Sequence, residues 1–292
     1  MVRRYSSSQI NSKLRQAQQR ARQAQQKRRQ AVNKLNQSIR QYNQAVRTYN
    51  ARVRANRQRL NSELARLSRQ PSVKVTTRHV VYRTSVETLH TSYARLDQYA
   101  ESHGLDDRYA HILDLSERET ANSLEVTNRI LGDEDAGDTP AESLDDSELL
   151  DGLRRISPEL DDRWKGAVFA LNTHNPDAAR HFCTSAREII AGILNTKAPD
   201  EDVFALLPDC ERTPQGSITR RSKIKYFLHR RGIAIDPLEE FVENDLENIL
   251  QLFGVFNEGT HGSTGTFSLR ELTSIRKRVE DGITFLAEII GD

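Results

Sequence analysis

The stretch Phe256-Asn257-Glu258-Gly259-Thr260-His261-Gly262 separates two apolar helical patterns near the C-terminus. Asp236 and Pro237 provide a helix start upstream, and Ser268-Leu269-Arg270-Glu271 has the pattern of a capping box downstream. Apolar residues at three- and four-residue spacing follow each start: Leu238, Phe241, Leu246, Ile249, Leu252, Phe253 and Phe256, then Leu272, Ile275, Val279, Ile283, Leu286 and Ile290. The stretch therefore predicts a break between two core helices.

Three further helices are predicted between residue 157 and this pair. Ser157-Pro158 and Asn175-Pro176 each open an amphipathic pattern. Residues 219–231 form a strongly basic helix that Gly232 closes. Residues 157–292 are therefore predicted to form an all-helical bundle of five helices.

Residues 1–70 form a basic arm. They contain eighteen Lys and Arg and one acidic residue, Glu63, a net charge of +17, whereas the rest of the chain carries −15. Such a segment attracts phosphates or an acidic protein surface. Residues 8–69 contain no Pro or Gly, so we expect one long helix.

The apolar residues of this arm follow the spacing of a coiled coil. Four- and three-residue steps alternate, with one interruption near Arg28: Ile10, Leu14, Ala17, Ala21 and Ala24, then Val32, Leu35, Ile39, Tyr42, Val46, Tyr49, Val53 and Leu60. The pattern predicts self-association. Because the arm has almost no acids, nucleic acid or an acidic partner would have to offset the repulsion between its cations.

Residues 71–131 form a middle segment. Alternating residues between Ser72 and Tyr82 predict a short strand, and helical patterns follow it. Ser116-Glu117-Arg118-Glu119 resembles a capping box that would start a helix ending at Gly132. Residues 132–156 are rich in carboxylates, and this composition predicts an acidic linker.

Two cysteines, Cys183 and Cys210, are too few for a disulfide framework or a zinc site, and Cys183 lies in an apolar helical pattern. The sequence has no run of eighteen apolar residues and no signal-peptide core. We therefore expect a cytoplasmic protein with no membrane contact.

His261 is the candidate for chemistry at the break between the two core helices. A histidine between a helix end and glycines can move a proton to or from a ribose hydroxyl or a leaving oxygen, if cations hold the phosphate. Asn257, one helical turn earlier, would position it. A second interpretation treats Asn257 as a helix cap and His261 as a loop residue. No phosphate loop, metal-ligand spacing or nucleophile elbow is present, so no cofactor or metal is expected.

The sequence resembles bacterial proteins known as predicted PIWI-associating nucleases. The resemblance rests on Asn175-Pro176-Asp177-Ala178-Ala179-Arg180 with Arg187-Glu188, on Thr219-Arg220-Arg221, on the stretch from Phe256 to Gly262 and on the Gln/Asn/Arg-rich coiled coil in front. It implies a nuclease of bacterial conflict systems. A defence-system protein would be its partner.

The bundle is more distantly similar to the HEPN superfamily of helical RNases and RNA-binding domains. Its motif is Arg, often followed by Asn, and then His, which Asn257 and His261 match. Phe256 stands at the Arg position, so the phosphate contact of the motif is missing from this place. The resemblance implies dimerisation through the bundle, which would bring two histidines together.

The sequence therefore predicts an all-α protein that binds nucleic acid, RNA rather than DNA, and forms homo-oligomers through the coiled coil and the bundle. It would be a metal-independent endoribonuclease or a degenerate RNA-binding relative. His261 and Asn257 would be the catalytic residues, and Arg180, Arg187, Arg220 and Arg221 would hold phosphate. The alternative is a non-enzymatic coiled-coil adaptor that binds a partner protein or nucleic acid.

Overall fold

A computed structural model describes most of the chain, and its contacts divide the chain into two units, residues 1–55 and 56–292. The described residues are 7–69, 77–103, 107–131, 149–172, 174–175, 177–258 and 268–291. They contain helices and no β-strand, apart from an isolated antiparallel bridge between Arg212 and Ile218. The predicted all-α class is confirmed.

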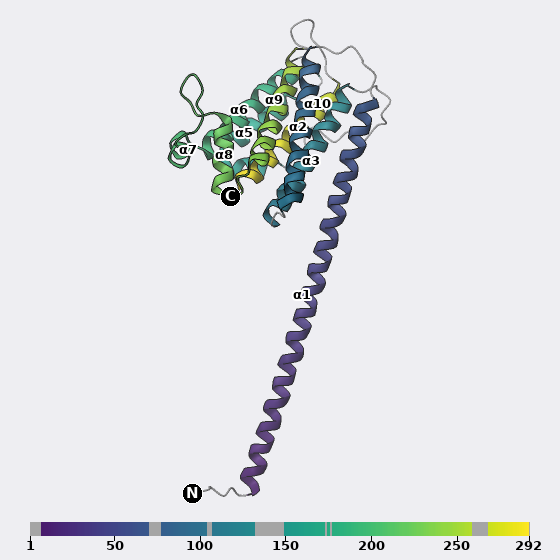
Figure 1. Ribbon diagram of the computed structural model, residues 1–292, viewed down its shortest axis with the longest axis vertical. Coiled ribbons are helices and arrows are strands. Elements are labelled where there is room, and N and C mark those ends of the chain that lie inside the picture. The colour runs from purple at the N-terminus through teal and green to yellow at the C-terminus, as the bar shows by residue number, and fades with distance from the viewer. Residues whose placement is uncertain are drawn as a thin grey trace. The chain divides into compact units, whose positions relative to one another are not determined.

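Helix α1 (Ser7–Arg69) confirms the long helix expected for the basic arm (Figure 1). It supplies all described residues of the first unit, and its last residues, 56–69, belong to the second unit. Helix-favouring Gln, Arg and Ala side chains without Pro or Gly account for its length. The coiled coil itself stays a prediction.

The second unit contains the other described helices (Figure 1). They are α2 (Thr77–His103), α3 (Asp107–Leu131), α4 (Leu150–Ile156), α5 (Pro158–Ala170), α6 (Ala178–Lys197), α7 (Asp200–Leu206), α8 (Arg220–Arg230), α9 (Asp236–Glu258) and α10 (Leu269–Ile290). None of the described helices combines the length and apolar character needed to cross a membrane.

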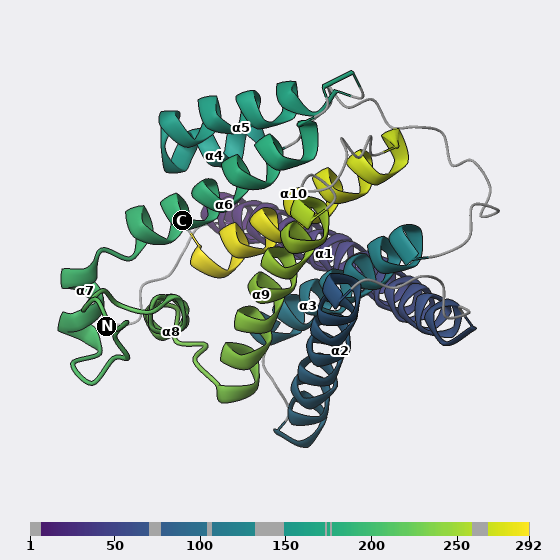
Figure 2. The ribbon, with the colours of Figure 1, turned by 90° about the horizontal axis from the view of Figure 1, so that it is seen from above.

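Helix α9 is the central element of this unit. It contacts α2, α3, α6, α8 and α10, and Figure 2 shows it between α2 on one side and α6 on the other. Phe241 of α9 packs edge-on against Phe285 of α10, with ring centroids 5.8 Å apart, and against Tyr93 of α2 at 6.4 Å. One hydrophobic core thus includes residues of the middle segment and of the C-terminal bundle.

Several predicted helix starts of the bundle are confirmed, and at each of them a capping hydrogen bond or a proline in the first turn is present. Ser268 and Glu271 form the capping box of α10, and the Thr219 hydroxyl accepts a hydrogen bond from the Ser222 amide at the start of α8. Gly232 ends the α8 turn with φ +64°, a conformation that favours glycine. Pro158 occupies the first turn of α5, as expected.

Two predictions for the middle segment are wrong. Thr77–Tyr82, expected in a strand, is helical in α2, because Tyr82 is the first buried residue of a helical row that continues with Val86, Leu89, Tyr93 and Leu96. The rest of the predicted strand lies outside the described residues. Ser116 starts no helix. It lies inside α3, where its hydroxyl bonds to the Ile112 carbonyl.

The acidic linker proposed for residues 132–156 includes a helix in its described part. Residues 150–156 form α4, and Leu149 and Leu153 belong to the hydrophobic core. The carboxylate-rich part, residues 132–148, lies outside the described residues. The linker interpretation therefore does not apply to the end of this segment.

Candidate functional site

The end of α9 is the region to which the sequence assigns chemistry. Phe256, one residue before Asn257, is buried with 1% of its surface exposed. The Asn257 backbone lies in the last turn of α9. Its side chain and all of His261 lie outside the described residues, so their proposed roles stay predictions.

Two arginines from neighbouring helices reach the last turns of α9. The guanidinium carbon of Arg187, on α6, lies 5.7 Å from the Phe253 ring centroid. Arg78, on α2, lies beside the next residue of α9, Gly254. A β-carbon built onto Gly254 would lie 3.8 Å from Cδ and 3.9 Å from Nη1 of Arg78. Both arginines are solvent-exposed. At 100° per residue, position 257 falls between positions 253 and 254 around the helix axis.

This arrangement concentrates positive charge where α9 has none of its own. The last turn of α9 contains no basic residue. Cations near a helix C-terminus interact favourably with its carbonyls, so one role open to Arg78 and Arg187 is to stabilise this end of the helix. The same guanidinium groups can bind phosphate oxygens through two parallel hydrogen bonds. Stability measurements are needed beside any activity measurement, because both roles involve the same residues.

The other predicted phosphate-binding arginines have different surroundings. Arg220, at the start of α8, donates a hydrogen bond of 2.7 Å to Glu247, and Arg221 forms an ion pair of 3.5 Å with Glu243. Both carboxylates belong to α9, so their charge offsets that of the two arginines. Arg180 is exposed on α6, two helical turns before Arg187 and on the same face.

No sequence pattern indicated Arg78 as a candidate site residue. It lies in the part of the chain where a strand was expected, and nothing in its local sequence relates it to Gly254. A helical assignment for residues 77–82 would have put it on a helix, but only the packing of α2 against α9 brings it to this place.

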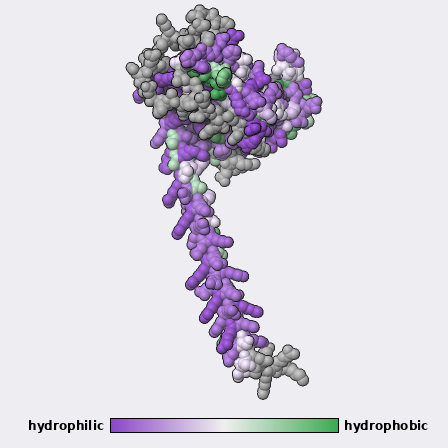
Figure 3. All heavy atoms as spheres, turned by 180° about the vertical axis from the view of Figure 1, so that it is seen from behind, coloured by the Kyte–Doolittle hydropathy of each residue, from purple (hydrophilic) through white to green (hydrophobic). Residues whose placement is uncertain are grey.

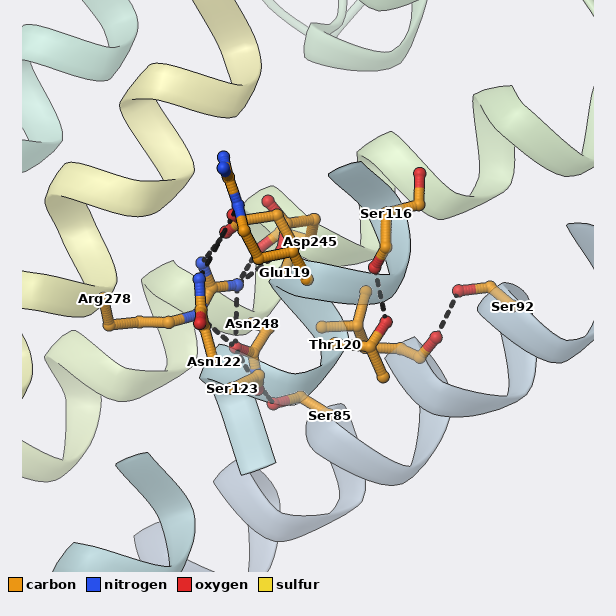
Figure 4. A network of polar contacts seen from close by, with 12 residues as sticks. Ser85, Ser92, Ser116, Glu119, Thr120, Asn122, Ser123, Asp245, Asn248 and Arg278 are labelled. Atoms are coloured by element: carbon orange, nitrogen blue, oxygen red, sulfur yellow. Dashed lines mark hydrogen bonds and ion pairs between the residues drawn. The ribbon is translucent and has the colours of Figure 1, made fainter. Parts of the chain in front are cut away.

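A buried charged network lies deeper in the same unit (Figure 4). Arg278 of α10 is fully buried and donates hydrogen bonds to Glu119 of α3, at 3.1 Å, and to Asp245 of α9. Its Nε also donates to Asn248 Oδ1 at 3.3 Å, and Asn248 in turn donates to Ser85 of α2. The network thus links α2, α3, α9 and α10 and fixes the two helices on either side of the predicted break.

Carboxyl groups of Glu119, Asp245 and Asp281 influence one another in this network, in which Arg278 and Arg118 are cations. Burial raises the pKa of Glu119 well above its usual range, and the negative charges of Asp245 and Asp281 raise it further. Burial also raises the pKa of Asp245, while Arg278 acts in the opposite direction. The buried carboxyls of this network therefore hold their protons more tightly than exposed carboxyls do.

Cys183 is a core residue, as its apolar helical pattern indicated. It is fully buried on α6, and burial raises the pKa of its thiol to about 12. A thiol with such a pKa is protonated at neutral pH and is a poor nucleophile. Cys183 therefore has a packing role.

A shallow groove of about 290 Å³ lies between α2 and α9. Its lining residues are Val80, Val81, Thr84, Ser85 and Thr88 of α2 and Asn244, Glu247 and Gln251 of α9. Among the described residues, no three His, Cys, Asp or Glu side chains lie close enough together to hold a metal ion.

Comparison with known proteins gives one match, and it lies in the C-terminal part of the chain. No curated protein and no solved structure gives a significant match to the chain. One family model does match, and it covers most of α4 to α10, including Arg187, Asp245 and Arg278. Residues 153–286 of this protein match the family described as "Predicted pPIWI-associating nuclease", which confirms the resemblance that the sequence indicated.

Proposed function

We propose that this protein is a defence-associated endoribonuclease that cleaves RNA without a metal ion, with its site at the C-terminal end of α9. The observation that carries the proposal is the pair of exposed arginines, Arg78 and Arg187, at Phe253 and Gly254, immediately before Asn257. The nuclease-family match includes Arg187 and α9. The likeness to the HEPN superfamily remains part of the proposal.

In this proposal Arg78 and Arg187 replace the motif arginine whose place Phe256 occupies. Phe256 is buried, so its position faces the core and not a substrate. An arginine from α2 and one from α6 would provide the cations that hold the scissile phosphate. Arg180 would bind a neighbouring phosphate along α6. Arg220 and Arg221 would contribute less, because Glu247 and Glu243 compete with phosphate for them.

His261 would perform the proton transfers. As general base it would take the proton of a ribose 2′-hydroxyl, whose oxygen then attacks the adjacent phosphorus. The bond from phosphorus to the 5′-oxygen breaks, and this oxygen takes up a proton as it leaves. The products are a 2′,3′-cyclic phosphate and a 5′-hydroxyl. Asn257 would position His261, and the bundle of a second copy of the chain, where two copies associate, would supply a second histidine as the acid.

The test is RNA cleavage by the wild type and by single variants, in EDTA. His261→Ala should lower the rate by about a hundredfold or more. Arg187→Ala and Arg78→Ala should lower it as well, whereas Arg187→Lys should recover only part of the rate, because lysine lacks the planar fork of arginine. Arg230→Ala, an exposed arginine at the end of α8, is the matched control.

Melting curves separate chemistry from stability. If Arg78→Ala and Arg187→Ala lower the rate only in proportion to a lost fraction of folded protein, the two arginines stabilise the end of α9 and have no role with phosphate. If the wild type cuts no RNA and His261→Ala leaves the biological effect unchanged, the catalytic proposal fails.

The second candidate function is a non-enzymatic adaptor that binds a partner protein or nucleic acid. The observation that favours it is the buried Phe256 at the position of the motif arginine. An adaptor would bind RNA or a partner protein equally well with His261→Ala. The cleavage assay combined with a binding assay therefore distinguishes the two functions.

A further inference from the structure

Helix α1 has a row of large apolar side chains that the chain itself leaves in solvent. We call Val32, Leu35, Ile39, Tyr42 and Val46 the apolar stripe. Their exposed fractions are 48%, 60%, 48%, 69% and 38%. Steps of three and four residues place all five on one face of the helix. Figure 3 shows how hydrophilic most of the visible surface of α1 is by comparison. Contiguous exposed apolar side chains indicate an interaction surface.

The same face of α1 is already an interface further along the helix. Continuing the three- and four-residue steps from Val46 leads to Leu60 and Leu67, which are 3% and 6% exposed and belong to the hydrophobic core of residues 56–292. The row is therefore continuous in sequence, buried at its C-terminal end and exposed between residues 32 and 46. The exposed part has the pattern of a packing surface without its partner.

The residue types in the apolar stripe indicate what that partner is. In a heptad labelled a to g, Val32, Ile39 and Val46 occupy position a, and Leu35 and Tyr42 occupy position d. Branched Val and Ile at position a, with Leu at position d, favour two parallel strands. An identical helix in register repeats this arrangement across the interface.

The charges of α1 permit this approach. Arg40, Arg47 and Arg54 recur at position b, on the outer side of the helix. The flanking e and g positions beside the apolar stripe carry no charge: Asn36, Ser38, Asn43 and Ala45. Two copies can therefore meet along the stripe while their arginines point away from the interface.

Upstream of the stripe, charge selects the orientation of the two helices. Lys13, Arg20 and Lys27 occupy position g, and Gln18 and Gln25 occupy position e. In a parallel pair each g residue faces an e residue of the other helix, so each cation meets an uncharged amide. In an antiparallel pair aligned on the stripe, g residues before the stripe face g residues after it, where Arg52 stands, so that cations would meet cations. Like charges at close range disfavour the second arrangement.

We infer that the apolar stripe of α1 binds the same stripe of a second copy of this chain in a parallel two-stranded coiled coil. The two copies of residues 56–292 then follow from the same end of the coiled coil. The outer rows of Arg40, Arg47 and Arg54 remain open to phosphates. Only this last consequence rests on the proposed function; the dimer itself does not.

The mass of the full-length protein in solution tests the inference. By sedimentation, the wild type should be a dimer in about 1 M salt, where the Debye length is about 3 Å and repulsion between the arms is screened. Ile39→Asp with Val46→Asp should shift it to the monomer. Gln37→Asp with Gln44→Asp makes the same change of charge on the outer side of α1 and should leave the dimer intact. A monomeric wild type, or a dimer that survives the stripe variant, would overturn the inference.

Disulfide formation tests the orientation. With Cys210→Ser as background, Val46→Cys should give an oxidised covalent dimer, because position 46 lies opposite position 46 only in a parallel pair in register. Gln44→Cys, on the outer side, should react far more slowly. Equal yields from the two variants would contradict the parallel arrangement.

Salt distinguishes this inference from the proposed function. Nucleic-acid binding weakens as salt rises, because releasing counterions into a more concentrated salt solution gains less entropy, whereas association of two basic helices strengthens. A dimer that cuts no RNA would leave the inference intact and count against the nuclease. RNA cleavage by a protein that is monomeric in both low and high salt would overturn the inference, and it would show that cleavage needs no histidine from a second copy.

Discussion

Arg278 and Glu119 are in direct contact where solvent is completely excluded: Nη1 donates a hydrogen bond to Oε2 at 3.1 Å, and neither side chain has exposed surface. The pair joins α10 to α3, and Asp245 extends it to α9. Burying charges costs free energy that only well-placed partners offset. The pair therefore holds three helices in one relative arrangement, and its effects on stability can be measured.

Removing the arginine should destabilise the protein strongly. Arg278→Leu leaves Glu119 and Asp245 buried without their cation, so the free energy of unfolding should fall by about 3–5 kcal/mol. Urea unfolding measures this change. Arg95→Leu removes an ion pair to Glu240 in which both side chains are well exposed, and it should cost less than about 1 kcal/mol. Equal costs for the two variants would contradict the account of the network.

The raised pKa of Glu119 predicts a pH-dependent stability. Because the folded state holds this proton more tightly than the unfolded state, its contribution is complete below the unfolded value, about 4.3, and is lost as the pH rises through the higher folded pKa. Glu119→Gln cannot ionise, so unfolding free energies above that value should fall less with pH than in the wild type. Glu240→Gln is the control. An unchanged pH profile for Glu119→Gln would show that Glu119 is ionised in the fold.

Placing an arginine at position 256, where the motif has one, should not increase RNA cleavage. Phe256→Arg would put a charge at a position with 1% exposure and remove an aromatic ring from the core, at a cost of about 3 kcal/mol or more. A lower melting temperature and no gain in RNA cleavage are expected. Phe169→Arg, at a position with 90% exposure on α5, should leave the melting temperature nearly unchanged. A stable and more active Phe256→Arg variant would mean that the position can face substrate.

Nucleic-acid binding by the basic arm should depend on residues 1–55. Deleting them should reduce retention on heparin and flatten the salt dependence of RNA binding, because most of the cations are removed. Deleting residues 1–69 should in addition lower stability, since this removes the buried Leu60 and Leu67 and the ion pair of Arg57 with Glu117. Circular dichroism melting compares the two truncations. Equal salt slopes for the full-length and truncated proteins would exclude the arm from binding.

Local sequence patterns are enough to place the helices whose ends depend on neighbouring residues. The Ser268 and Glu271 capping box, the Thr219 cap of α8 and the uninterrupted helix α1 follow from short-range hydrogen bonds and backbone propensity. Apolar spacing also identified the buried face of α9, including Phe253 and Phe256. These features can be predicted from the sequence, because every group involved lies within about one helical turn of its partner.

Which distant residues come into contact depends on how the helices pack. Alternating residues before Tyr82 favoured a strand, but packing of the Tyr82 face against the core made them helical. Arg78 lies beside Gly254, and Glu119 meets Arg278, although no local pattern connects either pair. The physical reason is that burial and charge pairing depend on distance in space. The packing of α2, α3 and α10 around α9 sets those distances, and a spacing along the chain does not.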